Sequence, residues 1–236
     1  MIKIENTEVV GWEHAIRGMR NPKNSWDRMD SYVGGCGTHV DDCDGCPGYR
    51  NEELCDAVVE GKYPVLGPND HKLMMQLANG GPVHAKYRRM IAVYVDITAP
   101  LYWWKEFDTY KIGTVANSCS TMHKIHHKQF ERSDFSCEKM DDAALLVLDA
   151  VIDFMEQERI KFCEDKKNKQ AWINMIQMLP TSYNQMRTVT LNYENLINMY
   201  YARRTHKLHE WHDYCDWIMS LPYAEQLITV KGDEEH

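Results

Sequence analysis

The sequence has no uninterrupted apolar stretch of about eighteen residues and no secretory leader. These two absences lead us to expect a soluble, cytoplasmic protein without a membrane partner. Basic charge is also scarce, because 27 Lys and Arg stand against 35 Asp and Glu, which gives a net charge of −8. Non-specific binding to nucleic acid requires a basic field, so we expect no nucleic-acid partner, although a local basic pocket could still bind a nucleotide.

Nothing in the sequence marks a boundary between two domains. A chain of 236 residues with 44% apolar composition can bury one sizeable core. Residues 31–67 differ from the rest because they are rich in Gly, Asp and Cys and lack a hydrophobic period. We therefore predict a single domain over residues 1–236, with residues 31–67 inserted into it.

The inserted segment carries a cysteine and histidine cluster. Cys36, His39, Cys43 and Cys46 have the spacing of a structural zinc site with a closed tetrahedral shell, and Cys55 is an alternative fourth ligand. A redox pair at Cys43 and Cys46, or reduced thiols in a loop, would leave the same pattern. The spacing predicts one zinc ion and leaves these alternatives open.

Periodic patterns predict most of the regular elements. The alternation of apolar residues indicates strands at 2–10 and 91–97, whereas helical spacing indicates helices at 12–20, 70–79 and 141–163. Another helix should begin at Ala99-Pro100, and residues 171–178 fit a short helix or a strand.

The longest amphipathic pattern runs from Thr190 to Ile218 without Pro or Gly, and it predicts one long helix with Asn192 as its N-cap. Its apolar stripe includes Arg203. A buried guanidinium is costly without an anionic partner, so Arg203 is a candidate ligand-binding residue. The simpler interpretation is that Arg203 and Arg204 are both solvated.

The order Leu179-Pro180, Asn192, Asn198 and Arg203 resembles the C-terminal signature of the flavin-dependent thymidylate synthases. The resemblance implies that the two asparagines lie against the flavin. It also implies that Arg203 contacts and polarises the uracil ring of dUMP, as a catalytic and substrate-binding residue. This chain has Glu194 where the family has an arginine.

A second stretch of the resemblance lies earlier in the chain. Pro82-Val83-His84 resembles the family's element that places a histidine near the flavin, which makes His84 a cofactor-binding candidate. Residues 99–120 align with the family's diagnostic motif. The alignment implies that Lys111 and Asn117 bind the cofactor and that Glu106 and Ser120 bind the substrate.

The diagnostic motif departs from the family at its centre. Thr109-Tyr110-Lys111 stands where the family has Arg-His-Arg, and a forked arginine is not replaced by Thr or fully by Lys. This change weakens the expectation of FAD binding in the family's manner. Glu106 in place of Gln also removes a hydrogen-bond donor, which should alter the preferred base edge.

The resemblance implies an α+β fold with a mostly antiparallel sheet flanked by helices. It further implies a homotetrameric enzyme that methylates dUMP at C5, using methylenetetrahydrofolate, NADPH and reduced FAD. That chemistry needs no side-chain nucleophile, so the lack of a catalytic triad does not count against it. Two alternatives stay open: a related enzyme that modifies another pyrimidine nucleotide or makes another product, and a non-catalytic binding protein on the same fold.

Overall fold

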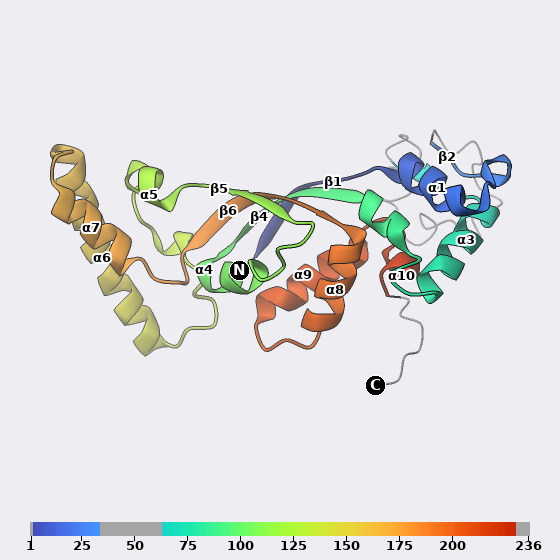
Figure 1. Ribbon diagram of the computed structural model, residues 1–236. Helices are drawn as coiled ribbons and strands as arrows, with labels where there is room; N and C mark the ends of the chain where they lie inside the picture. Colours follow the sequence, from blue (N-terminus) through green and yellow to red (C-terminus); the bar gives the residue numbers. More distant parts are fainter. Residues whose placement is uncertain (1, 34–62, 230–236) are drawn as a thin grey trace, which may run out of the picture. The chain divides into compact units, whose positions relative to one another are not determined.

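The computed structural model describes residues 2–33 and 63–229 (Figure 1). A four-stranded antiparallel sheet has the strand order β1-β4-β6-β5 and is flanked by helices, as expected for the α+β class. Its strands are β1 (Lys3–Val10), β4 (Ala92–Pro100), β5 (Val115–Ser118) and β6 (Asn184–Asn192). The helices of the described ranges are α1 (Trp12–Arg20), α3 (Pro68–Asn79), α4 (Leu101–Phe107), α5 (Thr121–Lys124), α6 (Asp142–Glu164), α7 (Lys169–Met178), α8 (Tyr193–Arg203), α9 (His209–Ser220) and α10 (Ala224–Leu227). None of these helices is both long and apolar enough to cross a bilayer.

Strand β4 confirms the clearest strand prediction. Val93, Val95 and Ile97 point to the buried side, whereas Tyr94 between them is exposed. Successive side chains of a strand point to opposite faces, so this alternation places one face of β4 on a core. The predicted strand at 2–10 is likewise confirmed as β1, and the predicted helices at 12–20, 70–79 and 141–163 are confirmed as α1, α3 and α6.

Contacts divide the chain into two compact units. The first unit contains residues 1–5, 95–111 and 115–189, and the second contains residues 6–94, 112–114 and 190–236. Each unit is therefore assembled from segments that are far apart in the sequence. The single domain proposed from the sequence stays a prediction.

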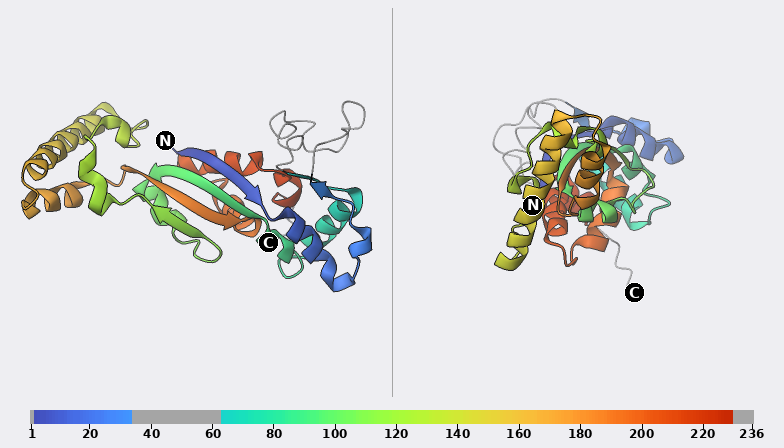
Figure 2. Two further views of the ribbon diagram at one scale, coloured as in Figure 1. Left: turned by 90° about the horizontal axis from the view of Figure 1, so that it is seen from above. Right: turned by 90° about the vertical axis from the view of Figure 1, so that its left-hand side faces the viewer.

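Helices α6 and α7 lie side by side in the first unit (Figure 2). Asp141 caps α6 by accepting a hydrogen bond from the Ala144 amide at 2.8 Å. One face of the helix pair packs on an apolar cluster formed by Ile125, Phe130, Phe135, Leu148, Ile152, Met155 and Met175. The segment at 171–178, for which the sequence allowed either element, is part of helix α7.

The second unit joins α1 and α3 through a buried ion pair. Arg20 is 3% exposed, and its Nε donates to Asp70 Oδ1 at 2.6 Å. Asp70 Oδ2 also accepts from the amides of Asp30 and Ser31, at 3.0 and 2.8 Å. Burial alone would raise the pKa of Asp70, but these hydrogen bonds and the contact with Arg20 hold that pKa below its usual value.

The structure corrects the prediction of one long helix between Thr190 and Ile218. Residues 190–192 belong to β6, and the helical part is divided into α8 and α9 by a turn at residues 204–208. The amide of His206 donates to the Arg203 carbonyl, and the Leu208 amide donates to His206 Nδ1 at 3.1 Å. The turn lets α9 pack back on α8, so that the apolar stripe of each helix becomes buried.

Two short strands lie just inside the ends of the predicted insertion at residues 31–67. β2 (Tyr32–Val33) and β3 (Pro64–Val65) are antiparallel, with Tyr32 opposite Val65 and Val33 opposite Pro64. The hydroxyl of Tyr223 accepts from the Leu66 amide at 3.0 Å and donates to the Pro64 carbonyl at 2.8 Å. The two ends of the segment are thereby joined to each other and to the C-terminal helices.

Candidate functional site

Asn192 lies where strand β6 passes into helix α8. Its side-chain oxygen accepts from the Asn195 amide at 3.1 Å, and the Asn195 side-chain oxygen accepts from the Asn192 amide at 3.2 Å. This reciprocal pair is a capping box that satisfies two backbone donors at once. The prediction that Asn192 is an N-cap is confirmed, and its side chain is held in one orientation.

A short loop of the second unit rests against this helix start. The Asn195 side-chain amide donates to the Ile112 carbonyl at 2.7 Å. Gly113 has a φ of +79°, and a Cβ placed there would lie 3.0 Å from Asn195 Oδ1 and 3.1 Å from Asn192 Nδ2. Only glycine fits this position without strain, so residues 112–114 are positioned by the two asparagines.

The other two predicted residues of α8 lie further along the helix. Asn198 is exposed and follows Asn195 by three residues, so the two side chains are neighbours on the helix surface. Arg203 is the last residue of α8, and it is half-buried rather than buried. Its guanidinium carbon lies 4.7 Å from the ring centre of Trp211, which is fully buried. At this distance the cation is attracted to the face of a rigid ring.

His84 lies in the turn after α3, where its amide donates to the Gly81 carbonyl at 3.0 Å. Its side chain is exposed and passes close to Gly80. The buried neighbour in this region is Arg88, which is 5% exposed and whose Nε and Nη2 have no hydrogen-bond partner among the described residues. Sequence reasoning did not single out Arg88, because an arginine next to an arginine usually lies in solvent.

Glu106 and Lys111 lie on either side of the C-terminal end of α4, in the first unit. Glu106 is half-buried and Lys111 is exposed. The Thr109 hydroxyl donates to the Glu106 carbonyl at 2.7 Å, which satisfies one of the last carbonyls of the helix. Thr109 therefore stabilises the end of α4, and Lys111 is the only cation of the segment at 109–111.

Asn117 and Ser120 follow in the same unit. Every residue of β5, including Asn117, is exposed. Ser120 is the N-cap of α5, and its hydroxyl oxygen accepts from the His123 amide at 3.0 Å. The Ser120 side chain thus has a structural partner, whereas Asn117 presents its amide to solvent.

Arg187 of β6 was missed by the sequence analysis. Its guanidinium carbon lies 4.2 Å from the ring centre of Trp104, and its Nη1 lies 2.8 Å from Asp108 Oδ1. These contacts join β6 to the end of α4, near Glu106. The sequence signal for β6 is weak. Buried and less buried positions alternate from Gln185 to Leu191, but polar residues stand at some of the inward positions and hide the apolar pattern.

The predicted residues divide between the two units. Glu106, Lys111, Asn117 and Ser120 belong to the first, and His84, Asn192, Asn198 and Arg203 belong to the second. That they form one site stays a prediction. The predicted zinc ligands Cys36, His39, Cys43 and Cys46 lie outside the described residues, and within residues 2–33 and 63–229 no group of three His, Cys, Asp or Glu side chains could hold a metal ion.

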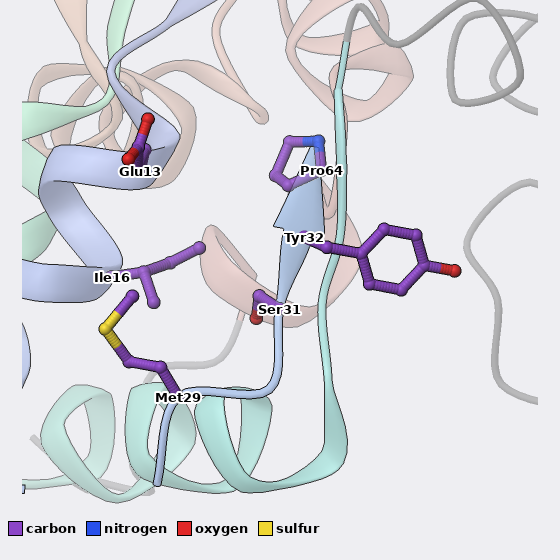
Figure 3. Close-up of a pocket in the computed structure, with 6 residues that line it drawn as sticks. All are labelled: Glu13, Ile16, Met29, Ser31, Tyr32 and Pro64. Atoms are coloured by element: carbon purple, nitrogen blue, oxygen red, sulfur yellow. The ribbon is translucent and has the colours of Figure 1, made fainter. Parts of the chain in front are cut away.

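A pocket of about 290 Å³ opens between α1 and the β2–β3 pair. Figure 3 shows Ile16 and Met29 extending toward each other, with the ring of Tyr32 directed away from them. Ser31, Pro64 and Glu13 complete the lining. Among the described residues no cation lines this pocket, so the chemistry of its described lining suits a small, mostly apolar group.

The fold of this chain is shared with solved structures, among them two crystal structures from Helicobacter pylori. One is thymidylate synthase X from Helicobacter pylori with FAD and dUMP, which is 16% identical, has a TM-score of 0.62, and is matched over 97% of this chain and 98% of that one. The other is the flavin-dependent thymidylate synthase of the same organism complexed with FAD and dUMP, at 17% identity, a TM-score of 0.59 and 97% of each chain. No protein-family model and no curated protein matches the sequence. The likeness confirms the expected α+β fold.

Proposed function

We propose that this chain is a divergent flavin-dependent thymidylate synthase-like enzyme that transfers a one-carbon unit to C5 of a pyrimidine deoxynucleotide such as dUMP. The observation that carries the proposal is the fold, which is shared over 97% of the chain with structures that hold FAD and dUMP. Asn192, Asn198 and Arg203 support it, because they match the resemblance in residue type and spacing. Methylenetetrahydrofolate, NADPH, a homotetramer and a cytoplasmic location belong to the same proposal.

Arg203 has the chemistry to stabilise negative charge on a pyrimidine ring. Its guanidinium carbon lies 4.7 Å from the ring centre of buried Trp211, so the cation is already held beside a rigid surface before any ligand binds. A preorganised cation needs little rearrangement when charge develops in the transition state. In this proposal Arg203 orients the base and stabilises its anionic form, and no side-chain nucleophile takes part.

The described residues fit the ring of a flavin better than its phosphates. The Asn192 oxygen is engaged in the capping box, while its Nδ2 makes no hydrogen bond among the described residues and lies beside Gly113. Asn198 adds a second amide on the same helix. Reduced flavin, when bound, supplies the hydride of the reaction. The segment at 109–111 contributes only Lys111 as a cation, so the diphosphate would need other partners.

The test combines flavin uptake with a matched pair of variants. Purified protein should take up FAD, and dUMP should raise its melting temperature and yield dTMP when folate and a reductant are supplied. Arg203→Ala should abolish product formation and weaken dUMP binding. Arg204→Ala removes the adjacent arginine, whose guanidinium carbon lies 5.0 Å from the ring centre of Tyr201. This variant should change product formation and dUMP binding far less. A protein that neither takes up FAD nor responds to dUMP would falsify the proposal.

Glu194 favours a changed substrate as the second candidate function. The family has an arginine at this position, and here Glu194 Oε2 is buried without a hydrogen-bond partner among the described residues. A buried carboxylate oxygen repels phosphate and favours a donor such as an amine or amide. A thermal-shift screen over deoxynucleotides decides between the two functions, because a response to dUMP alone counts against the changed substrate. A response to no nucleotide would favour the non-catalytic binding protein.

The zinc ion predicted at Cys36, His39, Cys43 and Cys46 is a separate proposal. Four soft or borderline ligands within eleven residues, in a segment with little apolar content, are typical of a structural zinc site. Elemental analysis of protein purified without a histidine tag should find one zinc per chain, and a chelator should lower the melting temperature. Protein that holds almost no zinc and melts unchanged with chelator would disprove the metal site.

A further inference from the structure

A second pocket of the second unit differs from the apolar one in its charge. It has a volume of about 500 Å³ and lies where α1 ends, beside two short 3-10 turns, η1 (Asn21–Lys23) and η2 (Trp26–Arg28), and the first turns of α3. Among its described lining residues only one is apolar. The lining residues are Arg20, Lys23, Asn24, Ser25, Asp27, Arg28, Asn69, Lys72, Leu73 and Gln76.

The rim of this pocket is positively charged although the chain as a whole is acidic. Lys23, Arg28 and Lys72 are exposed, and they form no ion pair within the part of the chain that the structure describes. Asp27 is the only acidic side chain among the described residues of the lining. Three cations against one carboxylate, in a protein of net charge −8, concentrate positive potential at one concave surface. Such a surface attracts small anions.

The floor of the pocket is rigid and its charge is already balanced. Arg20 is paired with Asp70 at 2.6 Å, and its Nη1 donates to the Ser25 carbonyl at 3.1 Å. Asp30 accepts from the amides of Asn69 and Asp70, at 2.8 and 3.0 Å. These bonds fix the turns that carry Lys23 and Arg28 to the start of α3, which carries Lys72. The backbone positions that carry the three rim cations are therefore fixed before a ligand arrives, which lowers the part of the entropy cost of binding that comes from the backbone.

We propose that this pocket binds a small molecule that carries a diphosphate group. Its volume lies within the range of ordinary small-molecule sites, roughly 300–1,000 Å³. A diphosphate offers several charged oxygens to three separated cations, and Arg presents a fork to phosphate while Lys acts as a point charge. The amides of Asn24, Asn69 and Gln76 provide neutral donors around the cations. The polar lining disfavours an apolar ligand.

The experiment is calorimetric titration of the full chain with inorganic pyrophosphate, compared between two double variants. Arg28→Gln with Lys72→Gln removes two rim cations. Lys86→Gln with Arg89→Gln removes one exposed Lys and one exposed Arg of the same unit that do not line the pocket, so the change in net charge is identical. We expect the wild-type protein to bind one pyrophosphate per chain. The pocket variant should bind roughly tenfold or more weakly, and the control within about twofold.

Three results would overturn the proposal. Equal weakening in both double variants means that the general field of the protein, and not the pocket, attracts the anion. Citrate binding as tightly as pyrophosphate means that the site does not select phosphate. A wild-type protein that gives neither heat nor thermal stabilisation with pyrophosphate at about 10 mM has no such site. Circular dichroism checks that both variants fold, and failure of FAD uptake leaves this test unaffected.

Discussion

Asn192 and Asn117 are both predicted to bind the cofactor, yet the structure treats them differently. Asn192 is held at the start of α8 by a capping box and by the loop that contains Gly113. Asn117 lies on β5, a strand whose residues are all exposed. The Asn192 side chain is positioned by hydrogen bonds within the protein. Any binding role of Asn117 depends instead on a ligand or on another chain. Mutations of the first residue should change stability, and mutations of the second should change binding alone.

Substitution of Asp70 should have the largest effect on stability. Its side chain is fully buried and accepts hydrogen bonds from Arg20 and from two backbone amides. Asp70→Asn leaves the Arg20 guanidinium buried without its anion. Removing one partner of a buried pair costs about 3–5 kcal/mol of the free energy of unfolding. Urea unfolding measures this loss, and a change below about 1 kcal/mol would show that the pair is not a principal support of the second unit.

The same pair predicts sensitivity to acid. The pKa of Asp70 is lower in the folded protein than its ordinary value of 3.8, so the folded state favours the ionised carboxylate. The resulting stability is fully present above the unfolded pKa and is lost as pH falls through the lower, folded pKa. Wild-type protein should lose more stability than Asp70→Asn when the pH is lowered from about 5 to about 3. Parallel pH profiles of the two proteins would contradict the assignment.

Gly113→Ala tests the loop that rests on Asn192. Its positive φ and its contacts with two asparagines predict a loss of about 2 kcal/mol. Gly81→Ala is the matched control, because Gly81 has a φ of +86° but no atom within 4 Å of its added Cβ. The control should show the backbone strain alone. If both variants lose equal stability in thermal or urea unfolding, the asparagine contacts do not hold the loop.

Asn192→Ala should cost about 1 kcal/mol, because it removes the N-cap of α8. Asn192→Asp keeps an oxygen that accepts from the Asn195 amide, so it should restore most of the stability. The same substitution removes the side-chain amide proposed to face the flavin. A variant that is stable but binds FAD poorly would separate the two roles, whereas full FAD binding by Asn192→Asp would exclude the amide.

Asn117→Ala should change stability least, by less than about 0.5 kcal/mol, since removal of an exposed strand side chain leaves no buried group unpaired. Its effect should appear in FAD affinity measured by fluorescence titration. A loss of more than about 1 kcal/mol in unfolding experiments would place Asn117 with Asn192 among the residues that support the fold.

Local patterns in the sequence predicted much of the fold. The alternation in β4, the cap at Asn192 and the spacing in α6 all depend on neighbours within a few residues. The break between α8 and α9 was missed because no Pro or Gly marks it, and packing of the two helices decides it. Strand β6 was missed because buried Gln185 and half-buried Arg187 interrupt its apolar pattern.

The candidate site was harder to predict than the fold. Asn192, Asn198 and Arg203 were identified by their spacing, and the structure places them on or beside one helix. The pairing of Arg20 with Asp70 spans fifty positions and leaves no local signal. The role of Gly113 depends on a contact with Asn195 that only the folded chain creates. Contacts of this kind are set by topology, so a single sequence does not reveal them.

The two hydrogen bonds between the Tyr223 hydroxyl and residues 64–66 have a consequence for synthesis on the ribosome. These bonds join positions 157 and 159 residues apart, and the ring of Tyr223 packs 5.5 Å from that of Trp12. The first helix of the second unit is therefore translated long before the residues that cover it. The ring of Trp12 therefore lacks its contact with Tyr223 until the last helices leave the exit tunnel. Chaperone binding should accordingly concentrate on that early segment during translation.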